Sequence, residues 1–263
     1  MGIGKFNIGN AIDKEIDNFV KGRKKLAKAW VLLKKDRYIL GLLEQSNKVA
    51  IVRMGYNDHG PVHAKIVALH ALKMMDLLKK EPSVVAENVG DYEDSQVAVL
   101  LGAYLHDCGI CLVREQHELT GTIVSRNSIN SILTKIYSDQ EKVARMASFV
   151  SESVLCHMGT HQATSLEARV VESADGTDAS KGRARIPFHI GKQDIHKFSA
   201  LAIERIDILP GRKKPIRIEV YMDNPAGIFQ TEQIMLKKIE DAKMTDYIEI
   251  IANIKGSRPT EIL

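Results

Sequence analysis

The stretch from Ser95 to Gly109 reads SQVAVLLGAYLHDCG and is apolar on nearly every side of a helix. Serine is a residue type that caps helix N-termini, and a helix that is apolar all round belongs in the centre of a bundle. The stretch ends at His106-Asp107-Cys108, and Gly109 stands where a left-handed C-cap is expected. We therefore expect a buried central helix that carries a histidine and an aspartate at its carboxyl end.

One helical segment precedes this central helix and three follow it, each with apolar residues at three- and four-residue steps. The first begins at Pro61, where the missing N–H costs no helical hydrogen bond, and carries His63 on its apolar line. Of the three that follow, one begins near His117, one ends near His157 and one ends near Asp175. Histidines and an aspartate thus stand at the ends of several apolar helices.

The N-terminal region is also helical in pattern. Apolar residues recur at helical spacing over residues 11–43, with an interruption at the basic cluster 21–25. Residues 49–54 are short and β-branched, which indicates a strand or an extended lead-in to the next helix. We expect one helical domain over residues 1–190, with its core at about 56–187.

The pattern changes after about Pro187. It predicts strands at 201–208 and 216–222, a helix at 226–242 and a further strand at 247–254. This ββαβ order predicts a small α+β appendage over residues 195–263, in which one helix covers a three-stranded sheet. The predicted fold class is therefore mainly α, with a helical bundle in front and a small α+β unit behind.

The composition describes a globular chain with ample material for a core. Of 263 residues, 44% are hydrophobic and 27% are charged, which excludes intrinsic disorder. The net charge of +4 permits an anionic ligand and a nucleic acid, but it lacks the concentrated basic face that would favour the latter. There is neither a secretory signal nor an apolar run long enough for a membrane span, so we expect a cytoplasmic protein without a membrane partner.

The three cysteines are Cys108, Cys111 and Cys156. An odd and sparse set argues against a disulfide framework and fits a reducing interior. Cys108 and Cys111 form a Cys-x-x-Cys pair, which is found in redox and zinc sites, but a zinc site needs a second such pair and the chain has none. We expect Cys108 to pack as a small hydrophobic residue.

The nine histidines are the residues that could do chemistry. Imidazole and carboxylate groups that converge at helix ends form a cage for divalent metal ions, because imidazole suits transition metals and carboxylates can bridge two of them. A lone histidine on an apolar face is more often a hydrogen-bonded core residue, and we interpret His70, His189 and His196 in that way. Asp175 alone could be a cap or an ion-pair partner. The joint order of the other positions favours a metal site.

That order resembles the HD-domain metal-dependent phosphohydrolase superfamily. Three segments carry the resemblance, namely HAKIVA at residues 63–68, LHDCG at residues 105–109, and Ala174-Asp175. The hallmark of the superfamily is H…HD…D on a bundle of about five helices, and members with two metal ions extend it to H…HD…H…H…D. The resemblance spans Tyr56 to Pro187, about half the chain.

The resemblance implies a set of metal ligands. His63, His106, Asp107 and Asp175 would surround one divalent ion, and His117 and His157 would hold a second, with Asp107 bridging and carrying the catalytic role. His117 can also be interpreted as a helix-start histidine that faces solvent. His161 competes with His157 for the same place, and we prefer His157 because it continues the apolar line of its helix. His59 and His161 are possible outer residues, and His59 could also orient the substrate.

The sequence departs from the family pattern at one position. Many binuclear members read His-Asp-x-Gly-Lys, and their lysine helps to hold the phosphate; Ile110 replaces it here. Another cation must then bind the phosphate. Lys181, Arg183 and Arg185 follow Asp175 closely and are the expected catalytic cations, with Arg114 as a weaker candidate. Residues 174–187 resemble a group of mostly archaeal predicted HD hydrolases that share the C-terminal appendage.

The expected function is that of a metal-dependent phosphohydrolase. It would cleave a phosphate monoester or diester of a nucleotide-like small molecule by a metal-activated water. The expected cofactors are two divalent ions, drawn from Mn, Fe, Ni, Co or Mg, and the expected assembly is a homo-oligomer, simplest as a dimer. The alternatives are a nucleotide-sensing HD module without turnover and a di-iron HD oxygenase.

Overall fold

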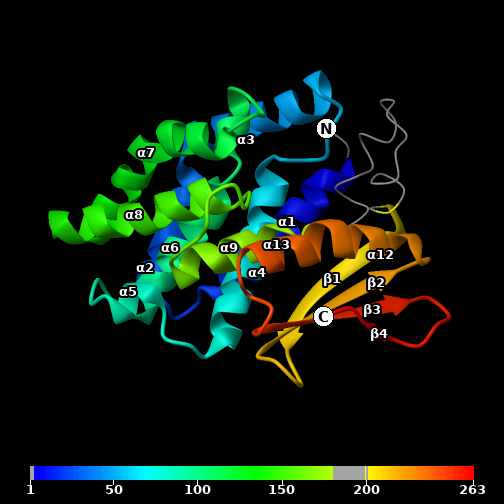
Figure 1. Ribbon diagram of the computed structural model, residues 1–263. Coiled ribbons are helices and arrows are strands. Elements are labelled where there is room, and N and C mark those ends of the chain that lie inside the picture. Colours follow the sequence, from blue (N-terminus) through cyan, green and yellow to red (C-terminus); the bar gives the residue numbers. More distant parts are fainter. Residues whose placement is uncertain (1–2, 180–198, 200) are drawn as a thin grey trace.

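The computed structural model describes residues 3–179, 199 and 201–263. The helical part contains α1 (Ile3–Phe19), α2 (Lys24–Lys35), α3 (Arg37–Asn47), η1 (Lys48–Arg53), α4 (Pro61–Leu78), α5 (Ser83–Ala86), α6 (Tyr92–Leu105), η2 (Cys108–Cys111), α7 (His117–Ile136), α8 (Gln140–Cys156) and α9 (Leu166–Asp175). The C-terminal unit contains β1 (Ile203–Pro210), β2 (Ile216–Met222), α12 (Ala226–Gln230), η3 (Thr231–Leu236), α13 (Lys237–Asp241), β3 (Ile248–Ile254) and β4 (Thr260–Glu261). The chain is mainly helical with a small α+β unit, as the sequence predicted (Figure 1).

The central helix α6 is buried on every side from Asp94 to Leu105. It packs against α2, α4, α8 and α9, so it is the shared core of the bundle. It begins one turn earlier than the sequence suggested, because Asp91 and Asp94 form a capping box at its start. Ser95 lies inside the helix and is fully buried, so its predicted capping role is wrong.

Asp94 also connects four parts of the bundle. Its carboxylate lies 2.5 Å from the ammonium of Lys25, accepts a hydrogen bond from Lys142 at 2.7 Å, and accepts another from the Tyr137 hydroxyl at 2.8 Å. Burial on its own would raise the pKa of Asp94, but the hydrogen bonds from Lys142, Lys25 and Tyr137 keep it below its usual value. Asp94 therefore stabilises the folded chain in its ionised form.

The N-terminal region contains three helices, α1, α2 and α3. Its first break falls at Gly22, inside the predicted interruption, where the backbone takes a left-handed conformation with φ of 85°. A second break falls at Asp36, whose side chain accepts hydrogen bonds from the first two backbone amides after Arg37 and caps α3. The break at Asp36 was not predicted, because Leu33 and Leu40 on its two sides are seven residues apart, a spacing that a continuous helix also allows.

Residues 48–53 form a π-helical turn, η1, so the strand or extended segment predicted there is wrong. Val49 and Ala50 are buried, and they pack with Ile110 in a small apolar cluster. Intrinsic β-propensity is weak, and burial against a neighbouring element overrides it here.

The C-terminal sheet has the order β1-β2-β3-β4. β1 and β2 are antiparallel, β2 and β3 are parallel, and the short strand β4 pairs antiparallel with β3. The crossover between the parallel strands runs through α12, η3 and α13, as the ββαβ order predicted; β4 adds a fourth strand to the three expected. The crossover helix contacts α9, and β1 and β2 contact α4, so the C-terminal unit packs directly on the helical bundle (Figure 1).

Across the two long described segments, no helix has both the length and the apolar character that a membrane crossing requires.

We expect Asp94→Asn to lower the free energy of unfolding by about 2 kcal/mol near neutral pH, because buried hydrogen bonds to a charged group are lost. The folded-state pKa of Asp94 is lowered, so this contribution is present above the ordinary value of 3.8 and is lost as the pH falls below it. Urea unfolding of the wild type and the variant at about pH 7 and about pH 3 checks both parts.

Asp207→Asn is the matched control, since Asp207 makes a half-exposed pair with Arg205 at 3.1 Å. Such a pair contributes about 0–1 kcal/mol. Equal losses in the two variants at neutral pH would contradict the role of Asp94.

Candidate metal centre

Six buried side chains meet where five helices begin or end. His63 lies in the first turn of α4, His106 and Asp107 follow α6 directly, His117 opens α7, His157 follows α8, and Asp175 ends α9. None of the six residues is more than 7% exposed as a whole. The carboxyl ends of α6, α8 and α9 carry partial negative charge, so their meeting point favours a cation.

The first half of the cluster surrounds one oxygen of each aspartate. Asp107 Oδ2 lies 3.3 Å from His63 Nε2 and 3.2 Å from His106 Nε2. Asp175 Oδ1 lies 3.2 Å and 3.6 Å from the same two nitrogens. Two imidazoles and two carboxylates thus face one small volume.

The second half of the cluster uses the other oxygen of Asp107. Oδ1 of this residue lies 3.2 Å from His117 Nε2 and 3.7 Å from His157 Nε2. Asp107 therefore stands between two histidine pairs and offers one oxygen to each. This is the geometry of a carboxylate that bridges two ions.

The hydrogen bonds of two of the rings leave the facing nitrogens available as ligand atoms. Nδ1 of His106 donates to the Ala103 carbonyl oxygen and Nδ1 of His157 donates to the Val154 carbonyl oxygen, both at 2.7 Å. A carbonyl oxygen only accepts, so in each neutral ring the lone pair is on Nε2. Backbone carbonyls commonly orient metal-binding histidines in this way.

The facing ring nitrogens are so close that they repel one another unless a proton or a metal ion lies between them. His63 Nε2 and His106 Nε2 are 3.1 Å apart, and His117 Nε2 and His157 Nε2 are 3.0 Å apart. Asp107 Oδ2 is also buried and receives no hydrogen bond from the described residues. An orphaned carboxylate oxygen beside facing nitrogens fits divalent ions, and every ligating group is one that such ions take.

The electrostatics of the cluster agree with this interpretation. Burial would lower the pKa of His106, but the charges of Asp107 and Asp175 raise it to about 9. Burial lowers the pKa of His157 to about 4. Burial would raise the pKa of Asp107, yet the charges on His106 and His59 hold it well below its usual value. The cluster therefore stabilises positive charge on His106, and burial keeps His157 neutral near pH 7.

Asp178 belongs to the site and was missed by the sequence analysis. His63 Nδ1 lies 2.7 Å from Asp178 Oδ2, and because an ionised carboxylate only accepts, the ring nitrogen donates. This leaves the lone pair of His63 on Nε2, which faces the cluster. The only signal in the sequence is that Asp178 follows Asp175 at helical spacing.

Lys238 is a second residue that the sequence analysis missed. Its ammonium lies 2.6 Å from Asp175 Oδ2, although it comes from α13 in the C-terminal unit. Burial would raise the pKa of Asp175, but the charges of Lys238 and His106 hold it well below its usual value. No local pattern in the sequence connects residues this far apart.

The two histidines predicted to lie around the cluster, His59 and His161, occupy different positions. His59 is buried beside His63, with ring centroids 5.8 Å apart, and its Nδ1 lies 2.7 Å from the Asn57 carbonyl oxygen. His161 is exposed and its ring contacts the Thr160 hydroxyl. Of the two competing histidines, the structure brings His157 to the cluster and leaves His161 outside it.

The predicted phosphate-binding cations Lys181, Arg183 and Arg185 lie outside the described residues, as do His189 and His196. Arg114 lies within them. Its guanidinium nitrogen Nη1 is 2.8 Å from Nδ1 and 3.0 Å from Nε2 of His117. A cationic side chain thus reaches the edge of the second histidine pair.

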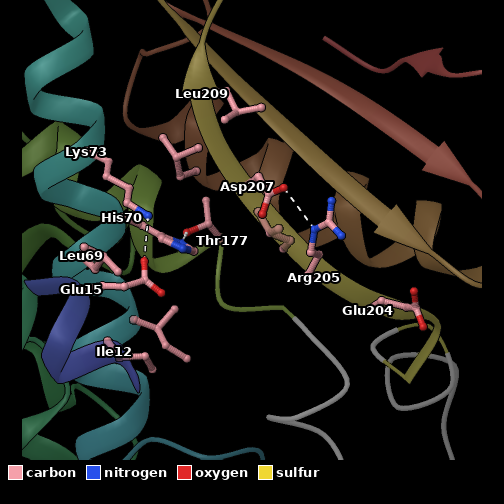
Figure 2. Close-up of a pocket in the computed structure, with 13 residues that line it drawn as sticks. Ile12, Glu15, Leu69, His70, Lys73, Thr177, Glu204, Arg205, Asp207 and Leu209 are labelled. Atoms are coloured by element: carbon pink, nitrogen blue, oxygen red, sulfur yellow. Dashed lines mark hydrogen bonds and ion pairs between the residues drawn. The ribbon is translucent and has the colours of Figure 1, made fainter. Parts of the chain in front are cut away.

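His70 lies apart from the cluster, as the sequence analysis expected. The Thr177 hydroxyl donates to the Ala174 carbonyl oxygen and accepts from His70 Nδ1 at 2.8 Å. Burial lowers the pKa of His70 to about 4. The ring borders a cavity of about 340 Å³ between α1, α4 and β1, where Lys73 pairs with Glu15 (Figure 2). His63 and His70, two turns apart on α4, therefore hold the two adjacent residues that follow α9.

Gly109 brings η2 against α7. It is not in the left-handed conformation that the sequence suggested. A Cβ atom at this position would lie 2.0 Å from the His117 carbonyl oxygen and 2.4 Å from the Gly121 backbone nitrogen. Glycine is required here for close approach, and this approach positions His117. Cys108 beside it is fully buried in the core, as expected.

The bundle and its cluster define a class of protein. Residues 62–180 match the family model of the HD domain, and all six clustered residues fall within that range. The chain belongs to the HD-domain family, most of whose members are metal-dependent hydrolases.

A relative matches the chain over nearly its whole length. The chain is 40% identical over 255 residues to "Uncharacterized protein MJ1020" of the archaeon Methanocaldococcus jannaschii, which covers 96% of this chain and 97% of the relative. The similarity therefore includes the C-terminal unit. No solved structure matches the chain.

We expect Asp107→Asn to remove bound metal, because both halves of the cluster lose their shared carboxylate charge. Elemental analysis of the purified wild type should find about two divalent ions per chain, and the variant should hold fewer than one. His161→Gln is the control and should retain the wild-type content. An Asp107→Asn protein that kept its full metal content would disprove the bridging geometry.

We expect Gly109→Ala to destabilise the metal-free chain by about 1–3 kcal/mol, the usual cost of overpacking, and to lower its metal content by displacing His117. Gly41→Ala is the matched control. This glycine is in α3, and a Cβ added to it would meet nothing within 4 Å, so alanine should stabilise the helix by about 0.5–1 kcal/mol. Denaturant unfolding and elemental analysis measure both effects, and similar behaviour of the two variants would argue against the close approach.

Proposed function

We propose that the chain is a metal-dependent phosphohydrolase with two divalent ions. His63, His106, Asp107 and Asp175 hold one ion, and His117, His157 and the second oxygen of Asp107 hold the other. The observation that carries the proposal is the position of Asp107, which offers one oxygen to each of two histidine pairs. Membership of the HD-domain family supports it.

Two divalent ions bound by these residues would supply a nucleophilic water of lowered pKa and would neutralise the charge of a phosphoryl group. Residues of the chain orient the groups that would hold the ions. Carbonyl oxygens behind His106 and His157 and the carboxylate of Asp178 behind His63 keep the Nε2 lone pairs directed at the cluster. Burial of the cluster strengthens each of these interactions.

The phosphate group of the substrate needs a cationic partner from elsewhere in the chain, because the segment that follows His106-Asp107 does not supply one. Ile110, which replaces the lysine of many binuclear members, is fully buried and packs with Val49 and Ala50. We propose that Lys181, Arg183 and Arg185 bind the phosphoryl oxygens, because guanidinium pairs with phosphate in a planar fork. Arg114, whose guanidinium already contacts His117, is a further candidate.

The substrate that we propose is a small nucleotide-like phosphate monoester or diester. The chain would act in the cytoplasm as a homo-oligomer, simplest as a dimer. The proposed ions are Mn, Fe, Ni, Co or Mg, because imidazole and carboxylate ligands accept all of them. One observation favours a second candidate function: the buried Ile110 removes a phosphate-binding group, which suits a module that binds nucleotides without turnover.

A hydrolysis assay tests the proposal. We expect the wild type, loaded with manganese, nickel or cobalt, to cleave p-nitrophenyl phosphate or bis(p-nitrophenyl) phosphate and to lose turnover on chelation. Asp107→Asn should be inactive, with a rate loss of at least about 10³-fold, because the bridging carboxylate is absent. His161→Gln is the matched control and should keep its rate.

A nucleotide library then assigns the substrate class. Tight nucleotide binding by a metal-loaded chain without hydrolysis would replace the proposal with the sensing module. Oxygen consumption by an iron-loaded chain would replace it with the oxygenase.

A further inference from the structure

Lys238 is the second residue of α13, in the C-terminal unit, and its side chain extends to the metal centre. Only 16% of this side chain is exposed. Its ammonium lies 2.6 Å from Asp175 Oδ2 and donates to the His157 carbonyl oxygen at 2.7 Å. One cation therefore connects the ends of α9 and α8, two of the helices that present the cluster.

The two oxygens of Asp175 have different partners. Oδ1 faces the histidine pair, 3.2 Å from His63 Nε2 and 3.6 Å from His106 Nε2, whereas Oδ2 is held by Lys238. A carboxylate fixed at one oxygen cannot rotate freely about its last bond. The ion pair therefore keeps Oδ1 directed at the place where an ion would bind. Partners of this kind commonly change metal affinity when they are removed.

A role in phosphate binding fits the contacts less well. The ammonium already has two close acceptors, Asp175 Oδ2 and the His157 carbonyl oxygen, and little of the side chain is exposed. A lysine that bound substrate would need to leave both acceptors, and each would then be buried without a partner. The contacts favour orientation of the ligand.

The positive charge of Lys238 lowers metal affinity, whereas its orientation of Asp175 raises it. An ammonium near the cluster repels a divalent ion, so its neutralisation alone would tighten metal binding. Loss of the hydrogen bond frees Asp175 and weakens binding. The two effects have opposite signs, so the direction of the measured change decides between them.

We propose that Lys238 is a positioning residue of the metal centre, which orients Asp175 and the end of α8 for metal binding. The C-terminal unit is therefore part of the site and contributes one of its orienting groups. This inference rests on the proposed function only in that the six clustered residues bind metal; it does not depend on which substrate is cut.

Cobalt titration of the full chain tests the proposal, with the absorption of bound Co²⁺ as the signal. Lys238→Met keeps the length of the side chain but removes its charge and its hydrogens. We expect it to weaken Co²⁺ binding by about 10–100-fold and to alter the absorption spectrum, while Lys238→Arg, which keeps both charge and donors, restores much of the affinity.

Lys237→Met is the matched control. Lys237 is the preceding residue, is 65% exposed in its side chain and pairs with Asp241 on the surface, so its loss should leave the affinity and the spectrum unchanged. Thermal unfolding of the metal-free proteins separates metal binding from stability. If Lys238→Met does not fold, Lys238→Gln and Lys238→Arg provide the comparison.

The outcomes distinguish this inference from the proposed function. Co²⁺ affinity that is unchanged or tighter in Lys238→Met would overturn the positioning role, even if the wild type hydrolyses phosphoesters. Weaker binding with a changed spectrum supports the role, even if the wild type cleaves no phosphoester. A wild type that binds no Co²⁺ would overturn both.

Discussion

The rest of the site depends on one carboxylate between two pairs of imidazoles. Asp107 offers one oxygen to His63 and His106 and the other to His117 and His157. Four ring nitrogens meet beside an acidic group, an arrangement that protons or metal ions stabilise. The fold therefore contains a cluster whose donor atoms fit cations, and the surrounding helices hold that arrangement in place.

The helical bundle provides this constraint through its helix ends. The apolar helix α6 is covered on all sides, so the dipeptide that follows it enters the core at a defined place. Backbone carbonyls of the last turns of α6 and α8 orient His106 and His157, and negative helix ends collect at the cluster. The core that stabilises the chain and the groups that would bind metal are thus built from the same helices.

The C-terminal unit packs against the HD domain and contributes a side chain to the cluster. Its crossover helix packs on α9, and Lys238 reaches the far oxygen of Asp175. On the opposite side of the same segment, Thr177 and Asp178 are held by two histidines of α4. Asp175 is therefore fixed from both directions, and the geometry of the site depends on contacts between the two parts of the chain.

Local patterns in the sequence were enough for the central helix and the ββαβ order, because periodicity is a property of neighbouring residues. The set of six clustered residues followed from the resemblance to the HD-domain superfamily. Local patterns failed wherever a distant segment decides the outcome. The π-helical turn at 48–53 follows from burial against Ile110, and Gly109 serves close packing against α7 and not a left-handed cap. Only the tertiary structure brought Asp178 and Lys238 to the cluster. It also placed His157, which the apolar line of its helix had favoured over His161, beside His117. The physical reason is that hydrogen bonds and ion pairs depend on distance in space, and separation along the chain carries little information about that distance.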